Sequence, residues 1–182
     1  MVRSRLALPS LVLALAPFAR AQSVVWSDSF ENGFADWTSQ IDGLTCGGEQ
    51  SIGGAPCAGA WQPIDATNVC AGWAVPFPDG AQVAWFGIQG NCTYHQDTPG
   101  GPSASNHLLL KLTPINLPNN AGSVSLRFLS KSECEPDSDY DQRTVKISAD
   151  GGAHWTTVGQ VWNSDWYEAS FDLSPWRGSN TR

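Results

Sequence analysis

The alternation of apolar and polar positions is clearest over residues 123–130. Val124, Leu126 and Phe128 occupy every second position, and a serine and an arginine stand between them. Successive side chains of a strand point to opposite faces of a sheet. This pattern therefore predicts a β-strand that is buried on one face.

A second pattern predicts a hairpin near the C-terminal end. Residues 143–149 and 154–162 read as strands, and Asp150-Gly151 lies between them. Asp-Gly between two such segments is typical of a type I′ turn, in which both central residues have positive φ. We expect a tight two-residue turn here.

The other strand signals are short and are separated by turn residues. Residues 42–79 form a long Gly-, Pro- and Cys-rich excursion, and no internal repeat or linker divides the chain. The pattern predicts an all-β fold: a single antiparallel, two-sheet jelly-roll sandwich over residues 22–182. The predicted strands are residues 23–30, 34–41, 83–88, 106–112, 123–130, 143–149, 154–162 and 167–173.

The first 21 residues predict a secretory signal peptide. Arg3 and Arg5 precede a short apolar run, and Ala19-Arg20-Ala21 supplies small residues at a cleavage site before Gln22. This layout predicts export to the medium or the cell surface. No stretch is long and apolar enough to predict a membrane span.

The charge balance narrows the range of partners. Three of the 10 basic residues lie in the predicted leader, so 7 basic residues face 17 acidic ones in the mature chain, a net charge of −10. Such an acidic surface argues against nucleic acid and anionic membranes as partners. Calcium, basic surfaces, neutral glycans and extracellular proteins remain suitable.

All five cysteines lie beyond the predicted leader, where an oxidising compartment favours disulfides. We expect the pairs Cys46–Cys57 and Cys70–Cys92, although spacing leaves other connectivities open. Cys134 is then left over, as a free thiol, an intermolecular bridge or the partner of a residue beyond Arg182. A strand end and turn at residues 171–178 come just before Arg182, so we expect a chain truncated before its last sheet strands.

The order of short motifs resembles the MAM-like jelly-roll modules of secreted bacterial proteins. The resemblance spans nearly the whole mature chain, and its pieces are Asp28-Ser-Phe-Glu31, Trp85-Phe-Gly87, Pro114-Ile-Asn-Leu117, Ser148-x-Asp-Gly-Gly-x-x-Trp155 and Phe171-Asp-Leu-Ser174. It implies a jelly roll, a role in adhesion or beside a secreted peptidase, and closing strands that this chain lacks.

Acidic residues in two segments make calcium the candidate cofactor. Asp137-x-Asp139-x-Asp141 resembles the start of an EF-hand loop, but Gln142 and Ser148 stand where that loop needs glycine and glutamate. The family resemblance instead implies calcium held by Asp28 and Glu31 with Asp139 or Asp141. The alternative is a solvated acidic loop.

No pattern predicts catalysis. His95, His107 and His154 are scattered, and no nucleophile or metal-hydrolase motif is present. Ser148-x-Asp150-x-Gly152-x-x-Trp155 fits the Asp-box of propeller blades, but a single copy cannot build a propeller, so we interpret it as a hairpin staple.

Nine tryptophans are the remaining functional signal. Those near loops include Trp61, Trp73 and Trp162, and exposed aromatic rings can stack on sugars or apolar side chains, although packing is their ordinary role. We expect an exported, non-catalytic adhesion or accessory recognition module. The alternatives are a carbohydrate-binding module that uses these tryptophans and an accessory domain of a larger secreted peptidase or hydrolase.

Overall fold

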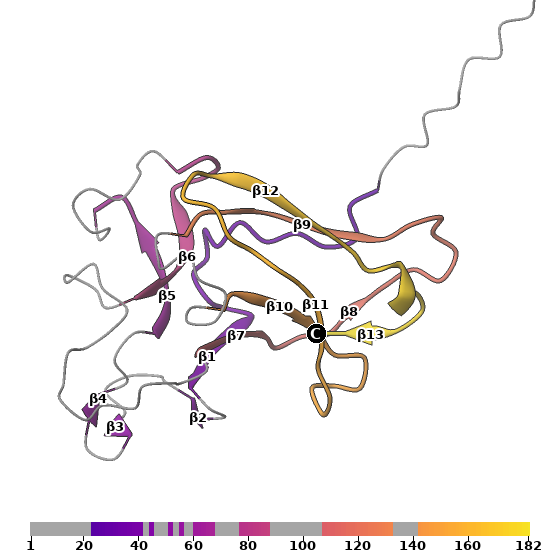
Figure 1. The fold of residues 1–182 in the computed structure, drawn as a ribbon, viewed down its shortest axis with the longest axis horizontal. Helices are drawn as coiled ribbons and strands as arrows, with labels where there is room; N and C mark the ends of the chain where they lie inside the picture. Colours follow the sequence, from indigo (N-terminus) through magenta and orange to yellow (C-terminus); the bar gives the residue numbers. More distant parts are fainter. Residues whose placement is uncertain are drawn as a thin grey trace, which may run out of the picture.

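The computed structural model describes the chain in eight stretches (Figure 1). These are residues 23–41, 44–45, 51–52, 55–56, 60–67, 77–87, 107–132 and 142–182. The predicted leader lies outside them. Within these stretches no helix is long and apolar enough to cross a membrane.

The described residues form an all-β fold in which every strand pairing is antiparallel, so the predicted fold class is confirmed. A single 3₁₀ turn, η1 (Ser174–Trp176), interrupts the strands of this part of the chain. The strands are β1 (Trp37–Ile41), β2 (Leu44–Thr45), β3 (Ser51–Ile52), β4 (Ala55–Pro56), β5 (Ala60–Asp65), β6 (Gln82–Gly87), β7 (His107–Lys111), β8 (Ile115–Asn116), β9 (Ser125–Ser130), β10 (Thr144–Ile147), β11 (Thr156–Gln160), β12 (Tyr167–Asp172) and β13 (Asn180–Thr181).

The strands pair as small ladders. One ladder has three strands in the order β2-β1-β7, and the others are the pairs β3-β4, β5-β6, β8-β13, β9-β12 and β10-β11. Figure 1 shows β9 and β12 running along one side of the molecule, while β8, β10 and β13 lie on the other. The ladders are too small to establish two continuous sheets, so the jelly-roll sandwich stays a prediction.

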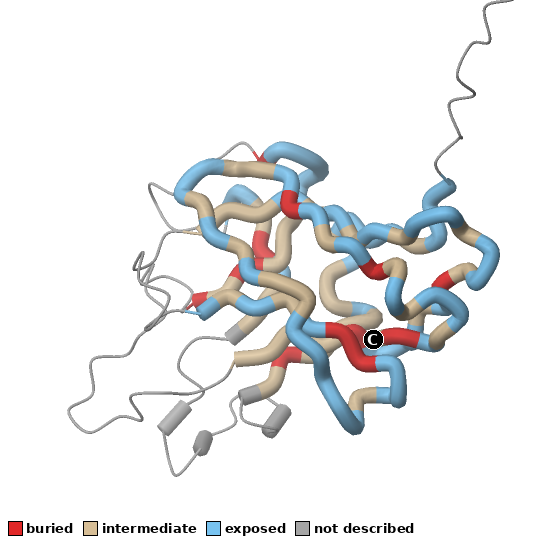
Figure 2. Tube along the Cα trace, turned by 45° about the vertical axis from the view of Figure 1, so that its right-hand side comes forward, coloured by how far each residue is buried: buried red, intermediate tan, exposed pale blue. Residues whose placement is uncertain are grey.

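The larger part of the core lies between these ladders (Figure 2). Leu117, Ile147 and Leu173 are buried together, and the half-buried Leu126 of β9 and Val158 of β11 pack against them. Burial of such aliphatic side chains is the main favourable term in folding. The predicted alternation of β9 is confirmed, because its residues are exposed and half-buried in turn.

A second cluster sits under the β5-β6 pair. Ile64, Phe77 and Trp85 are buried together, and Trp166 packs against them from the segment that joins β11 to β12. β5 was not predicted, because it lies in the Gly- and Pro-rich excursion of residues 42–79. This cluster fixes the end of the β11–β12 connection against the β5-β6 ladder.

The predicted first strand, residues 23–30, is wrong. Asp28 accepts a hydrogen bond from the Phe30 backbone N–H at 2.8 Å, and Phe30 takes a φ of 62°, the one positive value for a non-glycine residue in the described stretches. A short side chain that caps its own backbone in this way diverts the chain into a turn. The first ladder strand, β1, therefore begins at Trp37.

The predicted hairpin is confirmed, but its predicted turn is wrong. β10 pairs with β11, and residues 148–155 form an eight-residue loop between them rather than a two-residue turn. Positive φ falls on Gly151 and Gly152, at 78° and 100°, and Asp150 is not among the positive-φ residues. The side chain of Asp150 shapes the loop instead, through hydrogen bonds from Ser148 and His154.

The final residues are paired on two sides. β13 pairs with β8, and Arg182 exchanges two backbone hydrogen bonds of 3.0 Å with Ser148. β12 pairs with β9 over six residues. The segment expected to approach an unpaired edge is thus a paired strand followed by η1 and a second paired strand.

Candidate functional site

The two described residues of the predicted calcium site lie in the turn before β1. Both carboxylate oxygens of Asp28 accept hydrogen bonds, one from the Phe30 N–H and one from the Trp37 indole N–H, each at 2.8 Å. One oxygen of Glu31 accepts the backbone N–H groups of Ala81 and Gln82 at 2.7 and 2.9 Å. These bonds fasten the turn to β1 and β6.

The geometry tests the calcium prediction only in part. Carboxylate oxygens suit a hard cation, but calcium takes six to eight of them, and three of the four oxygens here already accept protein N–H groups. Asp139 and Asp141 lie outside the described residues. Within the described stretches no three His, Cys, Asp or Glu side chains gather closely enough to hold a metal ion. The calcium site stays a prediction.

A buried lysine completes the anchoring of this turn. Lys111 of β7 pairs with the Asp36 carboxylate and lies 5.4 and 6.0 Å from the ring centres of Trp26 and Trp37. The hydrogen bond from Lys111 lowers the pKa of Asp36 to about 2. A cation over aromatic faces is favourable when it is withdrawn from water. These contacts serve the fold.

The Asp-box folds back on itself in the β10–β11 loop. The Ser148 hydroxyl, almost fully buried, donates to the Asp150 carboxylate at 2.8 Å and accepts the Gly152 N–H at 2.8 Å. The Trp155 indole N–H donates to the Gly152 carbonyl at 3.1 Å. The predicted role as a hairpin staple fits these contacts.

Asp150 and His154 form the tightest polar pair of this loop. The Asp150 carboxylate accepts the His154 backbone N–H at 2.9 Å and lies 2.6 Å from the His154 Nδ1 atom. Hydrogen bonds from the backbone and ring of His154 hold the pKa of Asp150 well below its usual range. The carboxylate is therefore engaged within the loop itself.

The three candidate ligand-binding tryptophans differ in their placement. Trp61 of β5 is half-buried: its indole N–H donates to the His107 carbonyl at 3.3 Å, and its ring centre lies 5.6 Å from that of Phe86. It is a packing residue of the β5-β6 ladder. Trp73 lies outside the described residues. Trp162 is 57% exposed, the most exposed tryptophan in the described stretches.

Trp162 belongs to the 161–166 loop, which joins β11 to β12. The Trp162 backbone N–H donates to the Tyr167 hydroxyl at 3.1 Å, and the Asn163 carbonyl accepts the Ser132 N–H at 2.8 Å. Asn163 also accepts the Asp165 N–H through its side-chain oxygen at 3.1 Å. The Val161 N–H donates to the Arg143 carbonyl at 2.9 Å, so the backbone of this loop is fixed on both sides of Trp162.

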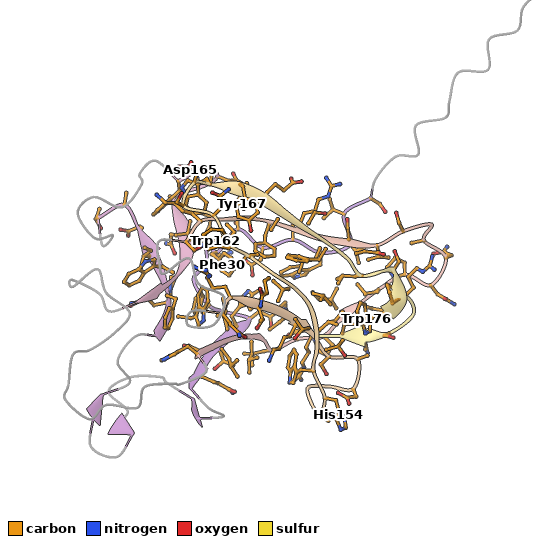
Figure 3. All side chains as sticks on the ribbon, in the orientation of Figure 1. Phe30, His154, Trp162, Asp165, Tyr167 and Trp176 are labelled. Atoms are coloured by element: carbon orange, nitrogen blue, oxygen red, sulfur yellow. The ribbon has the colours of Figure 1, made fainter. Side chains whose placement is uncertain are left out.

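The 161–166 loop turns one tryptophan inward and one outward. Trp166 packs on the cluster of Ile64 and Trp85, while the ring of Trp162 is largely in solvent. Figure 3 shows Asp165 and Tyr167 at the upper edge of this view with Trp162 below them, and His154 at the lower edge. Asp165 is exposed, and its carboxylate accepts no hydrogen bond from the described residues.

Sequence reasoning selected Trp162 but missed the residues around it. The signal that would have found them is the run Val-Trp-Asn-Ser-Asp-Trp, in which two tryptophans enclose three polar residues between two strands. In the structure Trp166 anchors this short connection, while Trp162 faces solvent. The predicted disulfide residues, Cys46, Cys57, Cys70 and Cys92, and the leftover Cys134 all lie outside the described residues.

Comparisons of this chain with models of known protein families, with curated proteins and with solved structures find no match.

Proposed function

We propose that this chain is an exported, non-catalytic recognition module, serving in adhesion or as the accessory domain of a larger secreted protein. Its contact surface includes the 161–166 loop. The observation that carries the proposal is the 57% exposure of Trp162 on a backbone held by hydrogen bonds. An exposed aromatic ring on a rigid support is a common means of recognition.

Two further features support a binding role. Exposing a large apolar ring to water is unfavourable, and burial against a partner would recover that free energy. Because the loop backbone is already fixed, little conformational entropy would be lost when a partner binds. The mature net charge of −10 makes nucleic acid an unsuitable partner.

The test is a binding screen of the full chain against immobilised extracellular probes. The panel holds neutral, acidic and sulfated oligosaccharides together with deglycosylated extracellular-matrix proteins. We expect at least one probe to bind the wild-type chain and to lose most of that binding on Trp162→Ala substitution.

Leu129→Ala is the matched control, because Leu129 is another exposed apolar residue, 44% exposed on β9. It should leave binding unchanged. A panel on which no probe shows Trp162-dependent binding would overturn the proposal, provided that circular dichroism shows both variants folded.

A further inference from the structure

We infer that the 161–166 loop binds a neutral carbohydrate, with the ring of Trp162 as the stacking platform and Asp165 as a hydrogen-bond acceptor for sugar hydroxyls. The inference rests on the proposed function and assigns its ligand class and polar residues. It starts from the contrast between the two ends of the loop, where Trp166 is packed and Trp162 is not.

The ring of Trp162 offers a surface of the right kind. The C–H face of a pyranose is flat and weakly apolar, so it packs on the negative face of an indole ring. The indole plane must be held still for such stacking to be selective. The bond from the Trp162 N–H to the Tyr167 hydroxyl holds the backbone from which the ring projects.

The polar neighbours of Trp162 complement a sugar. Asp165 lies three residues beyond Trp162, and its exposed carboxylate accepts no hydrogen bond from the described part of the chain. An ionised carboxylate can accept several hydroxyl donors, and such charge-assisted bonds are stronger than neutral ones. The Asn163 side-chain oxygen accepts the Asp165 N–H, and this bond fixes the backbone from which the Asp165 carboxylate projects.

The surroundings of the ring favour a sugar over a protein partner. The centre of a protein interface is an apolar patch depleted of charge. In the 161–166 loop the residues that follow Trp162 are instead polar: Asn163, Ser164 and Asp165. An exposed ring followed in the loop by hydrogen-bonding side chains matches a ligand that is apolar on one face and hydroxylated at its rim.

The charge of the loop favours a neutral sugar over an acidic one. The 161–166 loop itself carries Asp165 and no basic residue, and the Arg143 side chain beside it donates a hydrogen bond to Ser132. The chain as a whole carries a net charge of −7. Uronic-acid and sulfated glycans would be repelled at close range, where the interaction between like charges is strongest. Hexose and N-acetylhexosamine polymers carry no such penalty.

The test compares four variants of the full chain on immobilised neutral, acidic and sulfated oligosaccharides and on deglycosylated matrix proteins. We expect the wild type to bind a neutral oligosaccharide, Trp162→Ala to weaken binding tenfold or more, and Trp162→Phe to retain most of it. Asp165→Ala should weaken binding several-fold, and Asp165→Asn should lose less, because an amide oxygen still accepts hydroxyl hydrogens.

Each other outcome overturns a different claim. Trp162-dependent binding to a deglycosylated protein, or to acidic glycans alone, would overturn the neutral-sugar inference and leave the recognition role standing. Sugar binding that is unchanged in Trp162→Ala would overturn this loop as the site. Equal affinities of the wild type and Asp165→Ala would remove Asp165 from the site.

Discussion

β11 lies between two loops that use the same residue types in opposite ways. In the loop before it, residues 148–155, the Asp150 carboxylate and the Trp155 indole N–H both form hydrogen bonds within the loop. The 161–166 loop after it is also held by hydrogen bonds, but these come from its backbone and from Asn163. Its exposed tryptophan ring and its aspartate carboxylate face solvent.

The difference shows that a recognisable motif and a candidate binding surface need not coincide. In the 148–155 loop, the Asp-box residues are the scaffold, so substituting them changes stability. In the 161–166 loop, the scaffold is the backbone and the inward-facing Trp166, so Trp162 can change without unfolding the loop.

The largest effect is expected at Gly159, in the strand that supports both loops. The Phe171 ring of β12 packs so closely on Gly159 that an added methyl group would overlap it. Gly159→Ala should therefore lower the free energy of unfolding by about 3 kcal/mol. Urea denaturation measures the change, and a loss below about 0.5 kcal/mol would show that the ring moves aside freely.

The next effect is expected at Ser148. Its buried hydroxyl accepts the Gly152 N–H and donates to Asp150, so Ser148→Ala leaves both groups without this partner. We expect a loss of about 2 kcal/mol by urea denaturation. The control is Ser164→Ala in the other loop, where the serine is exposed and the stability should not change.

A smaller, pH-dependent effect is expected at Asp150. Its folded-state pKa lies below the ordinary value of 3.8, so the carboxylate stabilises the fold above that pH. The contribution is lost as the pH falls through the depressed folded-state pKa. Asp150→Asn should lower Tm at neutral pH, and the gap from the wild type should narrow in strong acid. A gap that is constant with pH would contradict the assigned hydrogen bonds.

The smallest effect on stability is expected at Trp162. Its ring is largely in water in the folded state, so Trp162→Ala should change the free energy of unfolding by less than about 0.5 kcal/mol. The same urea titration measures it. A loss of 2 kcal/mol or more would mean that Trp162 is a packing residue, and the contrast between the two loops would fail.

The sequence predicted the strands whose pattern is set by local alternation. β9 and the β10-β11 hairpin are such elements, because a two-residue period or a turn signal between two strands is visible in a short window. β5 was missed because glycine, proline and cysteine surround it, and its pairing with β6 depends on residues far along the chain. The turn at Asp28 was missed because a strand-like run was followed by a side-chain cap.

For the candidate site, the sequence could predict only which tryptophans lie near loops, not which of them are exposed. A count of loop tryptophans selected Trp162, but it also selected Trp61, which packs against Phe86. The exposure of a ring depends on which neighbours the chain brings to it, and periodicity does not encode that. The roles of Tyr167 and Asn163 in the 161–166 loop depend on single hydrogen bonds, which no sequence pattern identifies.

The pairing of β13 also bears on how the chain folds. Thr181 donates a side-chain hydrogen bond to the carbonyl of Ile115, 66 residues earlier, and Arg182 pairs with Ser148. Contacts so distant in sequence carry a large loop-closure entropy and form slowly. We expect this closure to be a late folding step. During synthesis, β8 and the Asp-box loop therefore stay without these partners until residues 180–182 have been made.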